Sequence, residues 1–151
     1  MEKKKKTSDR HSGLLNGYQS GDSPFFKWAC EHLGDLVLTN WSWGEIEMDW
    51  SIGDKMVMPD GVMFGGHIAS VADHIVGLVS MSVLERDDER FRTSRLETNF
   101  FRPLIKPRAR VIGRVTNASK NLIHAEADIF NANDKLAVRI YAVQMKRMTA
   151  E

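Results

Sequence analysis

One stretch of the chain, residues 58–82, constrains the fold more than any other. Within it, apolar side chains recur at helical spacing at Ile68, Val71 and Ile75, and alanines and valines between them widen the apolar surface. The pattern predicts a helix from about Gly66 to Ser82 that is apolar around most of its circumference. At 1.5 Å per residue such a helix is about 25 Å long, enough to cross a small domain.

The segments around this helix carry the signals of β-strands. Residues Glu45–Ile52 alternate between polar and apolar side chains, which is the clearest strand pattern in the chain. After the helix, short turn-forming segments separate further apolar runs at even spacing, which is typical of antiparallel strands. The order predicts an α+β fold in which a curved antiparallel sheet wraps around one buried helix. Strands are expected over residues 36–43, 45–52, 92–101, 108–116, 122–130 and 136–148.

The N-terminal region divides into a tail and a short helix. Residues 1–21 contain few apolar side chains, so we expect little fixed structure there, and a single domain over residues 22–151. Lys3–Lys6 form a basic run that is read as a solvated tail, with a weak anion-binding arm as the alternative. Ser23 and Pro24 are the N-cap and first residue of a predicted short helix.

Composition limits the classes of function. The net charge of +1 gives no overall attraction to nucleic acid or to an anionic membrane. Cys30 is the single cysteine, which excludes an internal disulfide and a cysteine-based metal cluster and fits a reducing cytoplasm. No apolar run approaches the roughly 20 residues of a membrane-spanning helix. We therefore expect a cytoplasmic protein without nucleic-acid or membrane partners, and we read the acidic face of residues 45–52 as solvated surface rather than a metal site.

Two features of the central helix indicate a possible functional site rather than core packing alone. Gly65 and Gly66 lie at its start, where unpaired N–H groups and the helix dipole could hold an anion or a developing oxyanion. Asp73 lies about two turns further on within an apolar helix, where an ionised carboxylate is unfavourable unless it is paired or faces a wet cleft. The residues alone leave two interpretations of Asp73: a functional carboxylate, or a structural one bonded to backbone or lying at a subunit interface.

Residues 64–73 and 96–103 together resemble the hotdog-fold acyl-CoA thioesterases of the phenylacetyl-CoA and 4-hydroxybenzoyl-CoA type. In that family a His-Gly-Gly turn opens the central helix, an Asp or Glu lies eight residues after the first glycine, and an Asn-Phe-x-Arg-Pro strand follows. The interval from Gly65 to Asp73 and the segment Asn99–Pro103 match this pattern. The resemblance covers roughly residues 36–148.

The resemblance implies hydrolysis of an acyl- or aroyl-CoA thioester to free acid and CoA, without a metal or redox cofactor. Asp73 would act as base or nucleophile, and the backbone N–H groups near Gly65 and Gly66 would polarise the thioester oxygen. It also implies sites at the interface of a homodimer, or of a dimer of dimers. Candidates for substrate or CoA binding are Phe64, His67, Asn99, Arg102, Ser119, Lys120 and Asn121. Arg102 and the turn at residues 119–121 could instead be ordinary surface residues, and His67 could be a helix-start histidine bonded to solvent.

Two residues depart from the family pattern. Phe64 replaces the histidine before the glycine pair, although His67 follows the pair closely. Gly77 stands where some relatives have a serine or threonine that helps to hold water. These departures favour a non-catalytic acyl-CoA-binding module as the main alternative to an enzyme. The His-Phe-Pro-Gly and Asp-x4-His runs of hotdog hydratases and dehydratases do not occur, and His74, beside Asp73, is expected to be structural.

Overall fold

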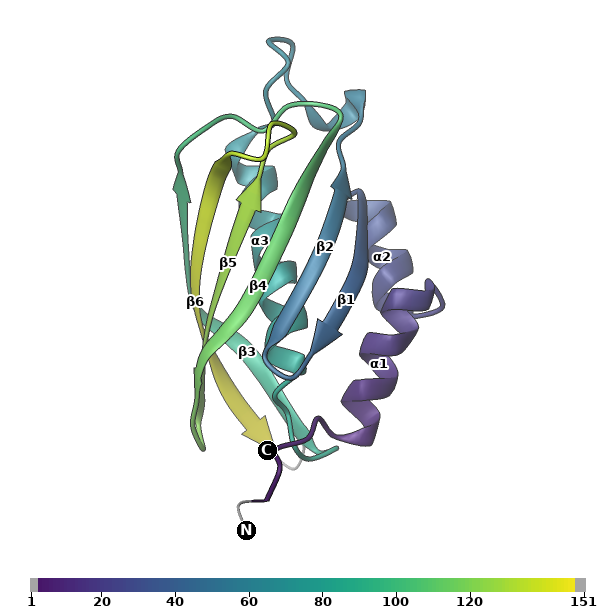
Figure 1. The fold of residues 1–151 in the computed structure, drawn as a ribbon, viewed down its shortest axis with the longest axis vertical. Helices are drawn as coiled ribbons and strands as arrows, with labels where there is room; N and C mark the ends of the chain where they lie inside the picture. The colour runs from purple at the N-terminus through teal and green to yellow at the C-terminus, as the bar shows by residue number, and fades with distance from the viewer. Residues whose placement is uncertain (1–2, 149–151) are drawn as a thin grey trace.

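The structure is a computed structural model, which describes residues 3–148. Its elements follow the predicted order, with an additional helix at the start and a short 3-10 helix before the central helix (Figure 1). They are α1 (Asp9–Ser20), α2 (Pro24–His32), β1 (Asp35–Ser42), β2 (Glu45–Ser51), η1 (Asp54–Met56), α3 (Gly65–Met81), β3 (Glu89–Phe100), β4 (Arg108–Ala118), β5 (Leu122–Phe130) and β6 (Leu136–Met148).

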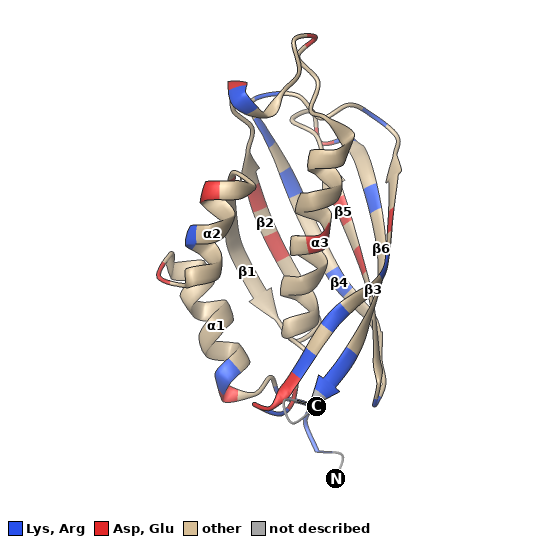
Figure 2. Ribbon diagram, turned by 180° about the vertical axis from the view of Figure 1, so that it is seen from behind, with Lys and Arg blue, Asp and Glu red and all other residues tan. Residues whose placement is uncertain are grey.

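The strands form one antiparallel sheet in the order β1-β2-β4-β5-β6-β3. The sheet curves around α3, and α1 and α2 lie beside α3 over β1 (Figure 2). This arrangement confirms the predicted α+β fold, a curved antiparallel sheet wrapped around a central helix. Within residues 3–148, no helix combines the length and the apolar character that a membrane crossing requires.

The core lies between α3 and the concave face of the sheet. Ile68, Val71 and Ile75 of α3 are buried, as their spacing predicted, and the predicted alternation in β2 is also confirmed. Gly113 of β4 shows how closely the layers approach: a Cβ there would lie 2.8 Å from Ile46 of β2 and 3.5 Å from Val79 of α3. A side chain at that position would have to displace the Ile46 side chain and would contact α3 directly.

The helix α1 corrects the expectation of little fixed structure before residue 22. Ser8 caps it by accepting a hydrogen bond from the His11 backbone N–H, and Gly21, at φ 85°, ends it. Leu15 and Tyr18 are fully buried in the same core cluster as α3. Composition gave the wrong expectation because only a few apolar side chains anchor α1, while the rest of its surface is polar and solvated. The stability of α1 therefore comes from tertiary packing.

The strand β3 lies at a free edge of the sheet and contains a bulge. It pairs with β6 on one side only, and no strand of the described chain pairs with its other side. Thr93 lies opposite Gln144 and Arg95 lies opposite Val143, so Ser94 is an extra residue in β3. The bulge shifts the alternation of side chains by one residue. Thr93 therefore faces α3 even though Leu96, three residues later, also packs against the core.

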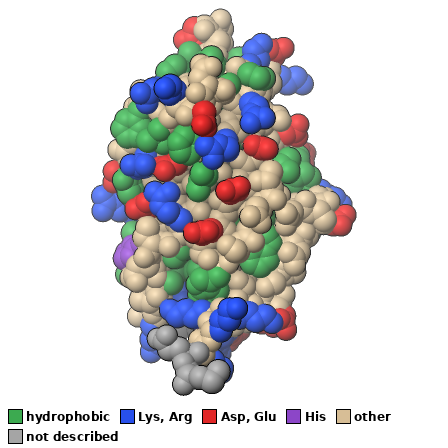
Figure 3. All heavy atoms as spheres, viewed as in Figure 1, with side chains coloured by type: hydrophobic (Ala, Val, Ile, Leu, Met, Phe, Trp, Pro, Cys, Tyr) green, Lys and Arg blue, Asp and Glu red, His purple; other side chains and the backbone are tan. Residues whose placement is uncertain are grey.

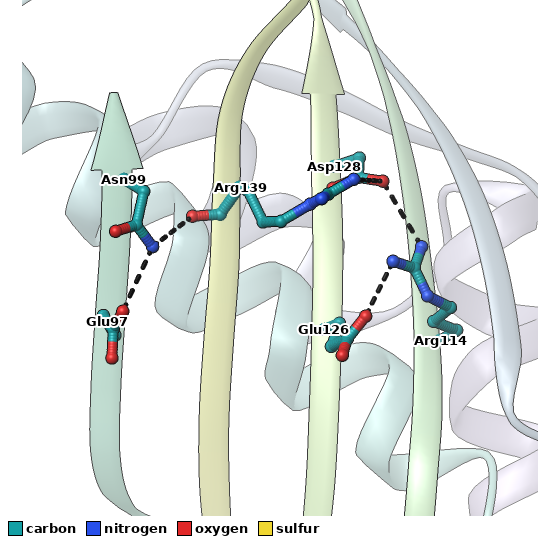
Figure 4. Close-up of polar contacts among 6 residues, drawn as sticks. All are labelled: Glu97, Asn99, Arg114, Glu126, Asp128 and Arg139. Carbon is teal, nitrogen blue, oxygen red and sulfur yellow. Dashed lines mark hydrogen bonds and ion pairs between the residues drawn. The ribbon is translucent and has the colours of Figure 1, made fainter. Parts of the chain in front are cut away.

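The convex face of the sheet carries interspersed acidic and basic side chains (Figure 3). At its centre Asp128 accepts hydrogen bonds from Arg139 at 2.8 Å and from Arg114 at 3.4 Å (Figure 4). Burial alone would raise the pKa of Asp128, but the hydrogen bonds and charges of Arg139 and Arg114 outweigh it and hold the pKa below its usual value. This face is a network of ion pairs on the side of the sheet away from α3.

Candidate active site

Asp73 lies midway along α3, on the side that faces β3. Its Oδ1 atom accepts a hydrogen bond of 2.7 Å from the hydroxyl of Thr93. Asp73 is exposed in the single chain, which corrects the buried, apolar setting that the sequence suggested. The reason is that this side of α3 faces a cavity and the free edge of the sheet, whereas the opposite sides face the core. The interpretation of Asp73 as a buried carboxylate bonded to backbone is therefore wrong.

A cavity of about 370 Å³ opens directly beside Asp73. Asp73 and Thr93 form its polar end, and Gly77 lies one helical turn further along α3. A Cβ at Gly77 would be 3.8 Å from the Phe91 ring, so the glycine leaves part of the space open. The rest of the cavity wall comes from four elements and the loop after α3. Its apolar part, which is the larger, includes Leu14, Phe25, Leu78, Met81, Leu84 and Phe91, and its polar part includes Arg10, His11, Glu89, Arg90 and Arg92.

His74 also lines this cavity, and its side chain ties α3 to α1. Its Nε2 atom lies 2.9 Å from the Tyr18 hydroxyl, which in turn donates to the Leu36 carbonyl at 3.1 Å. Because the single hydroxyl proton goes to Leu36, the neutral imidazole donates its Nε2 proton to Tyr18. Burial lowers the pKa of His74 to about 4, and the nearby Asp73 opposes this only weakly. The expected structural role of His74 fits these contacts.

The glycine pair begins α3 and is flanked by two exposed aromatic rings. Gly65 is the first helical residue, and Phe64, the N-cap residue, makes no side-chain capping bond. Within residues 3–148, no acceptor is paired with the N–H groups of Gly65 and Gly66. The Phe100 ring lies 3.6 Å from a Cβ built on Gly65, and the Phe64 ring lies within 2.6 Å of one built on Gly66. The turn thus offers free N–H donors between apolar walls, which suits a polarised carbonyl oxygen.

A family model described as the thioesterase superfamily matches residues 60–138. The chain belongs to the thioesterase superfamily. The matched segment contains the glycine turn, α3, Thr93 and most of the sheet, whereas α1 and α2 precede it. No curated protein sequence matches the chain significantly.

Solved structures of the same fold include several thioesterases. A thioesterase from Haemophilus influenzae is 22% identical with a TM-score of 0.76, over 91% of this chain and 92% of that one. A phenylacetic acid degradation-related protein from Ralstonia eutropha is 20% identical with a TM-score of 0.76, over 87% and 98%. A hypothetical thioesterase from Streptococcus pneumoniae, solved with coenzyme A, is 14% identical with a TM-score of 0.74, over 82% and 94%. At these identities the similarity shows the shared fold.

In this thioesterase-superfamily chain, the glycine turn and Asp73 lie on one helix but do not meet. They are eight residues apart, which corresponds to about 12 Å along the helix axis. A carbonyl group under attack must lie about 3 Å from both the nucleophile and the oxyanion donors. One protomer therefore cannot apply its own glycine turn and its own Asp73 to the same thioester.

The other predicted site residues lie away from Asp73 within the protomer. The Nε2 atom of His67 is 3.0 Å from the Leu33 carbonyl, so this ring is turned toward the end of α2. Asn99 lies on the convex face, where its amide contacts Glu97 and the Arg139 carbonyl (Figure 4).

Arg102 and the turn between β4 and β5 lie at opposite ends of the sheet. Arg102 follows β3 and donates to the Leu136 carbonyl at 2.8 Å. Ser119, Lys120 and Asn121 form the turn, which is far from the start of α3 (Figure 1) and lines a hollow with Val83 just after α3. Among residues 3–148, no three histidine, cysteine or carboxylate side chains are grouped as metal ligands.

Thr93 is the site residue that sequence reasoning missed. It belongs to no recognised motif and stands in a run of exposed polar residues in β3. Strict alternation counted back from Leu96 would point Thr93 to the convex face. Only the bulge at Ser94 turns it toward Asp73, and nothing in the local sequence marks that bulge.

Proposed function

We propose that the protein hydrolyses an acyl-CoA thioester to a free acid and CoA. The observation that carries the proposal is an exposed carboxylate, Asp73, held by Thr93 at the polar end of an apolar cavity. Thioester hydrolysis needs a nucleophile, or a base that makes one from water, together with a donor for the oxyanion. Two related folds were solved with CoA or acetyl-CoA, from Streptococcus pneumoniae and Streptococcus mutans, which supports a CoA thioester as the substrate.

The proposal includes a homodimer, because the glycine turn and Asp73 are about 12 Å apart along one helix. The 12-residue strand β3 has an unpaired edge, and such an edge is a template for pairing with another chain. Antiparallel pairing of two β3 edges about a two-fold axis would run the two α3 helices in opposite directions. Each glycine turn would then approach the Asp73 of the other protomer. The exposed rings of Phe64 and Phe100 beside the turn are apolar surface that such a contact would cover.

In this dimer Asp73 removes a proton from water as the water oxygen attacks the thioester carbon. The carbonyl oxygen becomes an oxyanion that accepts hydrogen bonds from the N–H groups of the partner protomer's glycine turn. The C–S bond then breaks, and the sulfur leaves as a thiolate that takes up a proton to give CoA. Direct attack by the Asp73 carboxylate, followed by hydrolysis of the resulting anhydride, gives the same products.

The same two-fold arrangement supports a role for the turn between β4 and β5. It would bring Ser119, Lys120 and Asn121 of one protomer to the end of the dimer that holds the partner's glycine turn. We therefore retain this turn and Arg102 as proposed contacts for the CoA phosphates.

The first prediction is that Asp73→Asn removes the basic and nucleophilic carboxylate but keeps an oxygen that can accept the Thr93 bond. We expect a folded protein that still binds acyl-CoA, with turnover reduced by about 10²-fold or more. The measurement is steady-state release of thiol from a series of acyl-CoAs, with calorimetric binding alongside. Asp49→Asn, a change of an exposed carboxylate on β2, is the matched control and should keep full activity.

Two outcomes would contradict the proposal. Near-normal turnover by folded Asp73→Asn would remove Asp73 from the mechanism. A wild-type protein that binds acyl-CoA but hydrolyses none of the series would instead favour the non-catalytic binding module.

A further inference from the structure

We propose that the cavity beside Asp73 receives the acyl group, and that Gly77 and Leu14 set the size of acyl group accepted. The preferred substrate then carries an apolar acyl group as large as an aromatic ring or a medium-length chain. This inference rests on the proposed function, because it takes the thioester carbonyl to lie at Asp73.

The cavity extends along α3 in one direction from the carboxylate. Asp73, Gly77 and Met81 occupy the same side of α3 on successive turns, a span of about 12 Å along the axis. The polar groups Asp73 and Thr93 lie at one end, and Met81 and Leu84 lie toward the other. An acyl group whose carbonyl carbon is at Asp73 can therefore extend past Gly77 into apolar surroundings.

The volume of the cavity exceeds what an acetyl group needs. An apolar cavity of about 150 Å³ is already large enough to hold benzene, and this one measures about 370 Å³. Gly77 keeps the passage open, because a Cβ there would already be in van der Waals contact with the Phe91 ring at 3.8 Å. A larger side chain at residue 77 would occupy the space itself.

Charged and polar side chains also line the cavity, namely Arg10, His11, Glu89, Arg90 and Arg92. The guanidinium groups of Arg10 and Arg90 donate to the Asp87 carbonyl, at 3.2 and 2.7 Å. The guanidinium of Arg92 donates to the Phe91 carbonyl at 2.9 Å. These cations are held in part by backbone oxygens, and most of the other lining side chains are apolar, which favours an apolar acyl group.

The helix α1 closes the cavity with residues that the family model does not cover. Leu14 belongs to α1, and α1 is fixed in place by the Tyr18–His74 hydrogen bond and by a 2.8 Å bond from the Ser8 N–H to the Leu84 carbonyl. Part of the cavity wall thus comes from this chain's N-terminal region, which is held against α3. We assign acyl-size selection to Gly77 on α3 and Leu14 on α1.

The test compares wild type with Gly77→Leu, which fills the passage, and Leu14→Ala, which widens it. The control is Gly13→Leu, the same substitution in α1 at a position with open space around the Cβ. The substrates are acetyl-, hexanoyl-, phenylacetyl- and palmitoyl-CoA, and non-hydrolysable thioether analogues of CoA with methyl, phenyl and long-chain groups are used for equilibrium binding. For Gly77→Leu we expect kcat/KM and affinity to fall about tenfold or more for the phenyl and hexanoyl groups, with the acetyl values kept.

For Leu14→Ala the preference should move toward longer chains, and Gly13→Leu should behave as wild type. An unchanged size profile in folded Gly77→Leu, or no preference of the wild type for groups larger than acetyl, would overturn the inference. Binding separates this inference from the proposed function. Size-dependent binding that is lost in Gly77→Leu, without any hydrolysis, would support the cavity assignment while refuting the enzyme.

Discussion

Asp73 and His74 are neighbours on α3 and line the same cavity, yet their side chains bond to different partners. Asp73 faces the cavity, is exposed in the single chain and accepts one hydrogen bond from Thr93. His74 is turned between α3 and α1 and bonds to Tyr18. Two adjacent helical residues point about 100° apart, so one can serve chemistry while the other serves packing.

The environment of His74 predicts a pH dependence of stability. Its pKa is about 4 in the folded protein and about 6.5 when unfolded, so the unfolded chain binds a proton more readily. Stability is therefore unaffected well above pH 6.5 and falls as the pH drops from about 6.5 toward 4. At pH 4.5 we expect wild type to lose about 2 kcal/mol more than His74→Gln, relative to pH 7.

Denaturant unfolding of both proteins at the two pH values measures this difference. His11, whose pKa is also lowered by burial, is present in both proteins, so its contribution cancels in the comparison. Parallel losses of stability in wild type and His74→Gln would show that His74 is not held neutral.

At the level of single residues, the sequence identified Asp73 and the glycine turn as candidates. It did not show which residues surround them. Their spacing and helical context are local properties, which a sequence displays directly. The Asp73–Thr93 bond joins residues 20 positions apart and depends on a bulge. Such a contact forms only when β3 pairs with β6. The Asp73–Thr93 bond therefore could not be predicted from the residues around Thr93.

Among the elements, those with a regular pattern were predicted well. The expected and observed limits coincide for β5 and β6, and α3 differs by one residue at each end. These segments form because apolar side chains repeat along one face, and this repeat is visible in the sequence. The helix α1 lacked such a repeat, because its anchoring depends on core residues contributed by α2, β1 and α3.

Leu15 provides a test of whether α1 is part of the folded domain. Its side chain is fully buried in the main core, so Leu15→Ala should lower the free energy of unfolding by about 2–4 kcal/mol through lost burial and a residual cavity. Chemical denaturation measures the change. Gly13→Ala, on the exposed side of the same helix, is the control and should be neutral or slightly stabilising. A flexible N-terminal tail would leave stability unchanged by Leu15→Ala.

For the whole molecule, one protomer contains both halves of the proposed thioester-hydrolysing site but holds them about 12 Å apart along α3. The free edge of β3 and the exposed aromatic rings beside the glycine turn favour a two-fold dimer in which the halves of different protomers meet. The fold class could be predicted from the order of elements. The arrangement of two protomers in the proposed dimer could not be predicted from the sequence. No residue pattern within one chain shows which exposed edge would pair with another copy.

The most direct test combines two inactive variants in one dimer. Asp73→Asn disables the carboxylate, and Gly65→Pro removes one N–H from the glycine turn. Proline suits this first helical position, because Phe64 before it is extended, at φ −64° and ψ 130°. Each variant alone should lose about 10²-fold or more in turnover.

The measurement is the thioesterase activity of heterodimers formed by co-expressing the two variants with different affinity tags. If each site takes Asp73 from one protomer and the glycine turn from the other, every heterodimer contains one intact site. Activity should then recover to about half that of the wild-type dimer. Heterodimers that form but remain as inactive as either variant alone would contradict a site shared between two protomers.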